Sequence, residues 1–208
     1  MDTGTRDYIN SLEVTDVPWS RMFTAYGTAN HYPELLSELE RITDIDQWKK
    51  TFNRISDFEH QSTLFPPAPF ALIFLVRQLQ KLLEEEKADD IAQRMINLFA
   101  YYIGICKDAE RMEHAHQLEH FSDLLDDENL LPEGCTEEEL LDVFEDPEAV
   151  SDELFYSFYY YSMTVLSQIP DILDRYGKFP EECKKLRDEI EAAAAMPEWR
   201  NEEQEVMK

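Results

Sequence analysis

The segment FEHQSTLFPPAPFALIFLVRQLQKLL, Phe58–Leu83, contains the most apolar stretch of the chain, and the other elements are expected to arrange themselves around it. Apolar side chains recur over Leu72–Leu83 at the three- and four-residue spacing that places them on one face of a helix. The first half of this helix, Ala68–Val76, is apolar on every side, and we therefore expect it to be buried on every side. Either Pro67 or Pro69 fits the first turn, because the N–H that proline lacks has no helical partner there.

Helical patterns also occur on both sides of this segment. Asp44 or Asp46 is a suitable N-cap for one helix, and Ser151 for a strongly aromatic one. Gly27 and Pro170 are expected to end helices. The expected helical stretches besides the central one are residues 19–27, 33–42, 46–55, 89–102, 107–125, 140–146, 152–169 and 180–195. With only 5 glycines and no strong strand pattern, the chain is predicted to be all-α, either a HEAT-like α-solenoid or an irregular multi-helix bundle.

The length of 208 residues suits one domain, and the 43% hydrophobic content is sufficient for a sizeable core. We expect a polar N-terminal lead-in at residues 1–17, a single helical domain at 18–197 and a charged tail at 198–208. The three cysteines are far apart and odd in number, which is typical of reduced thiols. The first residues show no signal-peptide pattern, and the longest apolar run is too short to span a bilayer. We therefore expect a soluble, cytoplasmic protein.

Acidic residues dominate the charge of the chain. It has 45 acidic and 19 basic residues, which gives a net charge of −26. Such a surface repels nucleic acid and anionic membranes and attracts basic proteins, so neither nucleic acid nor membrane is expected as a partner. Residues 112–174 contain 18 acidic residues and no lysine or arginine. Crowded like charges destabilise the compact state, and binding of a basic partner would offset that cost; a solvated acidic surface is the alternative.

The sequence has no recognisable enzyme motif: no phosphate-binding glycine loop, no nucleophile elbow and no zinc-protease motif. Glu113, His116 and His120 would share one face if residues 107–125 are helical, which leaves a metal-dependent enzyme as the least favoured alternative. Residues 126–129 lack the alternating acidic spacing of a calcium loop. We therefore expect no enzyme activity, no metal and no cofactor.

Several motifs in the first 83 residues resemble the start of a bacterial HEAT-like helical family whose members are often encoded beside polymorphic toxins and look like immunity proteins. The matching residues are Trp19, Ala25-Tyr26-Gly27-Thr28-Ala29, Pro33, Leu35, Leu36, Leu39, Trp48, His60-Gln61, the helix from Pro69 to Leu75, and Leu79. The sequence departs from the family at Ser62, where glycine is usual. The resemblance covers about a third of the chain and implies a protein that acts by binding a toxin. From the residues themselves, His60 and Gln61 are expected to serve the structure by satisfying backbone groups near a helix start.

The expected function is therefore that of an immunity protein, which binds a cognate basic toxin, for example a nuclease, through an acidic face and neutralises it by occlusion. The alternative is a generic helical scaffold or adaptor with another protein partner. Tyrosines of the aromatic helix are candidate interface residues because tyrosine is enriched at binding hot spots. The predicted toxin-binding residues are Asp123, Asp126, Asp127, Glu128, Glu137, Glu138, Asp142, Glu145, Asp146, Glu148, Asp152, Tyr156 and Tyr160.

Overall fold

The computed structural model describes residues 3–107, 116–136, 139–140, 143 and 150–194 of the chain. Over these residues the fold is an irregular bundle of helices with two small two-stranded antiparallel sheets. The prediction of an all-α chain is confirmed, and of its two architectures the irregular bundle is the one observed. Among the described residues, no helix is both long and apolar enough to cross a membrane.

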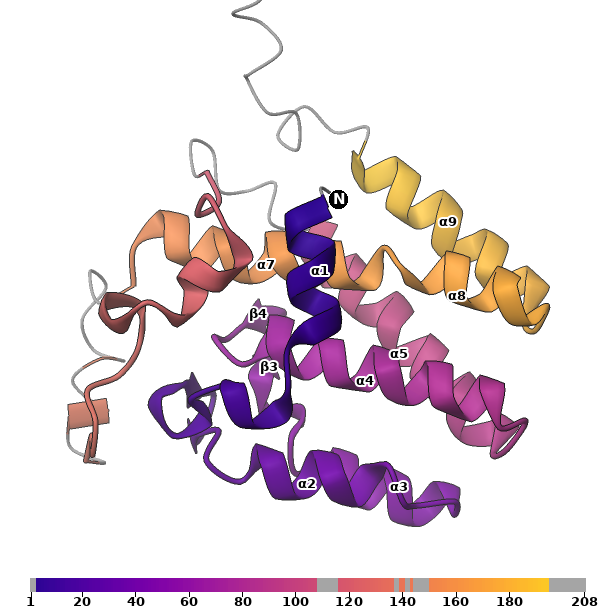
Figure 1. The fold of residues 1–208 in the computed structure, drawn as a ribbon, viewed down its shortest axis with the longest axis horizontal. Coiled ribbons are helices and arrows are strands. Elements are labelled where there is room, and N and C mark those ends of the chain that lie inside the picture. The colour runs from indigo at the N-terminus through magenta and orange to yellow at the C-terminus, as the bar shows by residue number, and fades with distance from the viewer. Residues whose placement is uncertain (1–2, 108–115, 137–138, 141–142, 144–149, 195–208) are drawn as a thin grey trace, which may run out of the picture.

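Helix α4 (Ala68–Glu84) lies at the centre of the bundle and packs against α5 (Asp89–Lys107), α7 (Asp152–Leu166) and α8 (Ile169–Tyr176) (Figure 1). Every residue from 68 to 76 is buried, which confirms the expectation for the apolar half of this helix. Pro67 occupies the N-cap and Pro69 the first turn. The helix is central because no face of its first two turns is compatible with water.

The remaining helices form layers on either side of α4 and α5. Helices α2 (Tyr32–Leu39) and α3 (Ile45–Phe52) pack together on one side, and α9 (Pro180–Ala194) packs on α8 and α5 on the other (Figure 1). Asp44 caps α3 by accepting a hydrogen bond from the backbone N–H of Gln47 at 2.8 Å, as predicted. The Ser151 hydroxyl likewise accepts from the backbone N–H of Leu154 at the start of α7.

The N-terminal residues are not a loose lead-in. They form helix α1 (Thr3–Ser11), which crosses the bundle. Ile9 of this helix and Leu12 just after it are buried. The guanidinium of Arg77 on α4 donates to the backbone oxygens of Leu12 at 2.7 Å and of Ile9 at 2.6 Å. Helix α1 is therefore held by two hydrogen bonds and by its apolar face.

The prediction of a short helix at residues 19–27 is wrong beyond its first turn. A 3₁₀ turn at Trp19–Arg21 is followed by a hairpin of β1 (Phe23–Thr24) and β2 (Gly27–Thr28). Gly27 does not end a helix; it begins β2 with a φ of +153°, which side-chain-bearing residues rarely adopt. A second hairpin, β3 (Glu59–His60) and β4 (Thr63–Leu64), precedes α4. Both strand pairs are too short to show the alternation by which strands are recognised in a sequence.

Two further expectations about helices need correction. Residues 116–120 are not helical, and a 3₁₀ helix covers only Phe121–Leu125, so the prediction of a helix through 107–125 is wrong over this part. Pro170 lies in the first turn of α8 instead of closing α7, which already ends at Leu166. The sequence Thr136–Glu139 also has the spacing of a capping box, and the structure shows one: the Glu139 N–H donates to the Thr136 hydroxyl, and the Thr136 N–H donates to the Glu139 carboxylate. Most of the helix expected after it lies outside the described residues.

Candidate functional site

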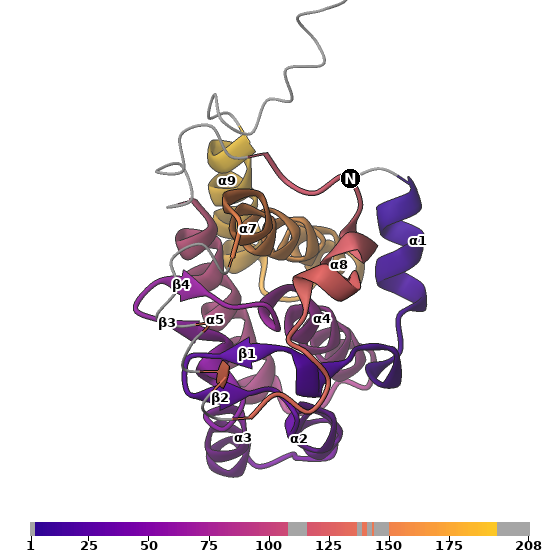
Figure 2. The ribbon, with the colours of Figure 1, turned by 90° about the vertical axis from the view of Figure 1, so that its left-hand side faces the viewer.

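The two hairpins lie side by side at one end of the bundle, where Figure 2 shows them facing the viewer. The backbone N–H of Ala25 in the first hairpin donates to the backbone oxygen of Asp57, just before the second, at 2.9 Å. The rings of Phe23 and Phe65 meet edge to face with centroids 6.0 Å apart. The hairpins therefore form one unit, although more than thirty residues separate them in the sequence.

The Asp57 carboxylate joins the two hairpins to helix α2. One of its oxygens accepts a hydrogen bond from the Thr24 hydroxyl and the other from the Tyr32 hydroxyl, both at 2.7 Å. Thr24 and Tyr32 are fully buried. Burial, together with the negative charge of Asp57, raises the pKa of the Tyr32 phenol far above its usual value. The phenol therefore stays protonated and remains a donor to Asp57 at every physiological pH.

Two tyrosines are the large apolar side chains that stand out from the described surface, and both belong to this end. Tyr26 is 75% exposed and Tyr101 is 49% exposed. The Tyr26 hydroxyl lies 2.9 Å from His60 Nδ1, and the two rings meet edge to face. Tyr101 lies beside the Glu59 carboxylate, and its pKa is raised by partial burial and by that carboxylate. Each exposed ring is thus held in place by a side chain of strand β3.

The turn of the second hairpin holds a strained conformation. Gln61 and Ser62 have φ values of 51° and 65°, in the left-handed region that residues other than glycine rarely adopt. The Ser62 N–H donates to Glu59 Oε1 at 2.8 Å, and the Tyr159 hydroxyl on α7 donates to the Ser62 backbone oxygen at 3.3 Å. These contacts fix the turn, so that Gln61 and Ser62 are presented to solvent in one shape. We call Tyr26, Glu59, His60, Gln61, Ser62 and Tyr101 the hairpin surface.

Residues 116–136, here called the acidic loop, run down the same end of the molecule past the hairpins (Figure 2). Arg21 holds this loop: its Nε donates to the backbone oxygen of Leu131 at 2.6 Å, and its Nη1 lies 2.7 Å from Asp127 Oδ1. Among the described acids of the loop, Asp127 is the one that pairs with an arginine or lysine. Asp126 and Glu128 are exposed beside it. The hairpin surface therefore has an acidic border.

The predicted contact residues fall into three groups. Asp126, Asp127, Glu128 and Asp152 are exposed, whereas Asp123 is partly buried and caps the 3₁₀ helix by accepting from the His120 N–H. In the aromatic helix α7, Tyr156 is 4% exposed and Tyr160 is half-buried, so the tyrosine run contributes mainly to the core. The residues Glu137, Glu138, Asp142, Glu145, Asp146 and Glu148 lie outside the described part of the chain.

Sequence reasoning missed Tyr26, His60 and Tyr101 as a surface group. The sequence contains part of the signal, namely the AYG segment and the His-Gln pair, but their positions beside a turn and a helix start favour a structural role. Nothing in the sequence indicated that Tyr26 and His60, thirty-four positions apart, are hydrogen-bonded. Tyr101 was hidden in the otherwise apolar pattern of α5.

Of the residues proposed for a metal site, His116 and His120 do not share a helix face. His116 and His120 lie in a non-helical stretch, and Glu113 is outside the described residues. Across the part of the chain that the structure describes, no three histidine, cysteine or acidic side chains gather closely enough to hold a metal ion. Cys106, Cys135 and Cys183 are free, and burial raises the pKa of the Cys106 thiol far above its usual value. Cys106 is thus a core residue and not a nucleophile.

Comparisons with known proteins identify no relative of this chain. No family model, no curated protein and no solved structure matches it. The features that bear on function are therefore the geometry of the hairpin surface and its acidic border.

Proposed function

We propose that this protein is an immunity protein that binds a basic toxin domain and neutralises it by occlusion. The observation that carries the proposal is the hairpin surface, where exposed tyrosines are already held in place beside carboxylates that lack basic partners within the described chain. The resemblance of the AYG and His-Gln motifs to a toxin-associated family supports the same conclusion, since both motifs contribute to this surface. The mechanism requires no catalytic group in this chain.

The arrangement suits rapid and tight binding of a cationic protein. Tyrosine contributes a large contact area with few rotatable bonds, and a side chain that is already ordered loses little entropy when it binds. The hydrogen bond between Tyr26 and His60, and the position of Tyr101 beside Glu59, provide that order. Complementary charge raises association rates to about 10⁸–10⁹ M⁻¹s⁻¹ at low salt. A complex of standard size would bury about 1,600 Å² in total.

Occlusion follows from what the acidic border attracts. A toxin that acts on nucleic acid holds the phosphates of its substrate with lysines and arginines. Asp126, Glu128 and Asp152 are exposed and offer carboxylates to the same cations. A toxin whose cations are occupied in this way no longer binds its substrate.

The test is co-expression of the full chain with the basic C-terminal toxin domain encoded by the neighbouring upstream gene. We expect growth rescue and a co-purifying complex whose Kd rises with salt. Tyr26→Ala should weaken binding at least about tenfold, because a hot-spot tyrosine contributes about 2 kcal/mol or more. The double reversal Asp126→Lys with Glu128→Lys should slow association and reduce the salt dependence.

The matched control is the double reversal Glu84→Lys with Glu86→Lys. It makes the same change of charge at the turn between α4 and α5, at the opposite end of the bundle (Figure 1). The control should leave association nearly unchanged. Equal effects of the two reversals, or the absence of both rescue and complex, would contradict the proposal.

A further inference from the structure

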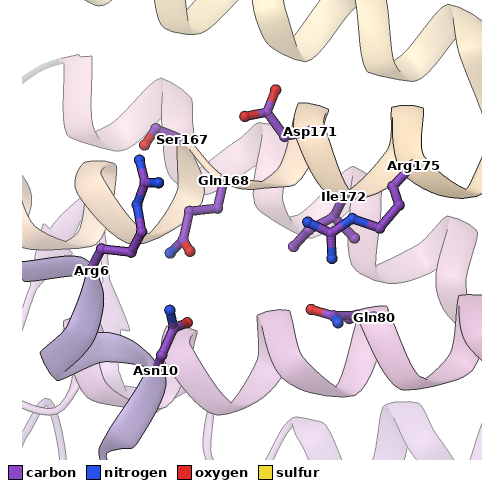
Figure 3. Close-up of a pocket in the computed structure, with 8 residues that line it drawn as sticks. All are labelled: Arg6, Asn10, Gln80, Ser167, Gln168, Asp171, Ile172 and Arg175. Atoms are coloured by element: carbon purple, nitrogen blue, oxygen red, sulfur yellow. The ribbon is translucent and has the colours of Figure 1, made fainter. Parts of the chain in front are cut away.

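A polar pocket of about 500 Å³ lies between helix α1, helix α4 and the junction of α7 with α8 (Figure 3). Arg6 and Asn10 line it from α1, Gln80 from α4, and Gln168 and Arg175 from the α8 side. Figure 3 shows the guanidinium groups of Arg6 and Arg175 at the left and right of the pocket, with the amides of Gln168 and Asn10 below Arg6 and the amide of Gln80 below Arg175. The pocket shares no residue with the hairpin surface.

The charge of this pocket is opposite to that of the molecule. In a chain with a net charge of −26, it contains two arginines, and neither forms an ion pair with any residue that the structure describes. The acid in its lining, Asp171, lies 3.6 Å from the guanidinium of Arg187 on α9 and is partly neutralised there. Helix α8 also begins at this junction, and its N-terminal dipole adds positive potential.

The lining indicates the chemistry of a ligand. Guanidinium groups bind phosphate and carboxylate through two parallel hydrogen bonds. The side-chain amides of Asn10, Gln80 and Gln168 donate and accept hydrogen bonds, which suits hydroxyl groups. Ile172 is the one apolar side chain among the described residues of the lining, so a hydrophobic ligand would be poorly held. The volume falls in the range of small-molecule sites and exceeds that of a single phosphate ion.

We propose that this pocket binds a small, polar, elongated molecule that carries an anionic group, phosphoryl or carboxylate, at each end. Arg6 binds one end and Arg175 the other, and the amides contact the middle. Because Arg6 belongs to α1 and Arg175 to α8, the bound molecule connects the N-terminal helix to the bundle. Ligand binding therefore stabilises the folded chain and raises its Tm.

The experiment compares matched probes on the full chain by isothermal calorimetry and thermal unfolding. One series is fructose 1,6-bisphosphate, fructose 6-phosphate and fructose, and the other is adipate, glutarate and butyrate. In at least one series, we expect the probes with two anionic groups to bind at least about tenfold more tightly than the probe with one anionic group. Fructose, which has none, should not bind. The series that binds better identifies the anionic group as phosphoryl or carboxylate.

Variants assign the binding to the pocket. Arg6→Gln and Arg175→Gln should each weaken the better probe about tenfold or more, since each removes a charge-assisted contact. The control is Arg41→Gln, which removes an exposed arginine at the end of α2 and should leave affinity unchanged. The proposal is overturned if no probe with two anionic groups binds more tightly than its counterpart with one. It is also overturned if Arg41→Gln weakens binding as much as the pocket variants do. Circular dichroism of each variant confirms that it is folded.

Discussion

At the scale of single residues, the most consequential group is the Asp57 carboxylate. Both of its oxygens are used, by hydroxyls that are 33 and 25 positions away in the sequence, and both donors are fully buried. A buried donor or acceptor that loses its partner costs more than the hydrogen bond itself contributes, because its desolvation is no longer compensated. This carboxylate therefore fixes the position of the first hairpin relative to the second.

Replacement of Tyr32 by phenylalanine tests this role without removing the ring. We expect Tyr32→Phe to lower the free energy of unfolding by about 1.5–3 kcal/mol, because a hydrogen bond to a charged group is lost. Tyr26→Phe removes a hydroxyl from a ring that is 75% exposed, and should change stability by less than about 0.5 kcal/mol. Urea unfolding of the two variants provides the measurement; equal losses would refute the proposed role of Asp57.

At the scale of elements, the second hairpin shows how an unfavourable local conformation is maintained. Gln61 and Ser62 both adopt positive φ, and hydrogen bonds to Glu59 and from Tyr159 hold the turn. Both contacts of Ser62 use backbone atoms, so they do not require a serine side chain. A local contact with Glu59 and a tertiary contact with Tyr159 therefore stabilise this turn together.

Glycine at position 62 should relieve the strain while keeping those contacts. We expect Ser62→Gly to raise the free energy of unfolding by about 0.5–1 kcal/mol, the gain from removed strain exceeding the extra entropy of glycine in the unfolded chain. The control is Ser37→Gly within α2, where glycine should lower stability by about 0.5–1 kcal/mol. A loss of stability in Ser62→Gly of the same size as in the control would exclude strain at the turn.

At the scale of the whole molecule, the net charge of −26 opposes folding into a compact shape. Several of the described ion pairs, among them Lys49–Asp46, Lys81–Glu40 and Lys87–Glu85, lie on the surface, and surface pairs contribute little to stability. Repulsion among the unpaired acids acts over distances that salt screens effectively, with a Debye length of about 10 Å at 0.1 M. The compact state is therefore destabilised by charge at low ionic strength.

Salt should consequently stabilise this protein. We expect the Tm to rise by several degrees, on the order of 5 °C, when NaCl is raised from about 10 mM to about 500 mM, because 1 kcal/mol corresponds to a few degrees in a domain of this size. Addition of sucrose at equal osmolality serves as a control for effects unrelated to charge. A Tm that falls with salt would show that attractive ion pairs outweigh the repulsion.

The sequence by itself determined the helical class, the central buried helix and the N-caps of α3 and α7. These features depend on local patterns: apolar spacing over residues 68–83, the side chains of Asp44 and Ser151, and prolines in first turns. The same reasoning failed at residues 1–17 and 19–27. A short helix and two-residue strands are selected by packing against distant elements: Ile9 is buried in the core, and the ring of Phe23 meets that of Phe65.

Only the tertiary structure decided which residues meet at the surface. The acidic content of residues 112–174 is visible in the sequence, but the position of its loop beside Tyr26, His60 and Tyr101 depends on Arg21 binding Leu131 and Asp127. The convergence of Arg6 and Arg175 on one pocket depends in the same way on how α1 crosses α4. Local propensities act over a few residues, whereas these contacts link positions 65 to 110 apart, so they arise only when the core has formed.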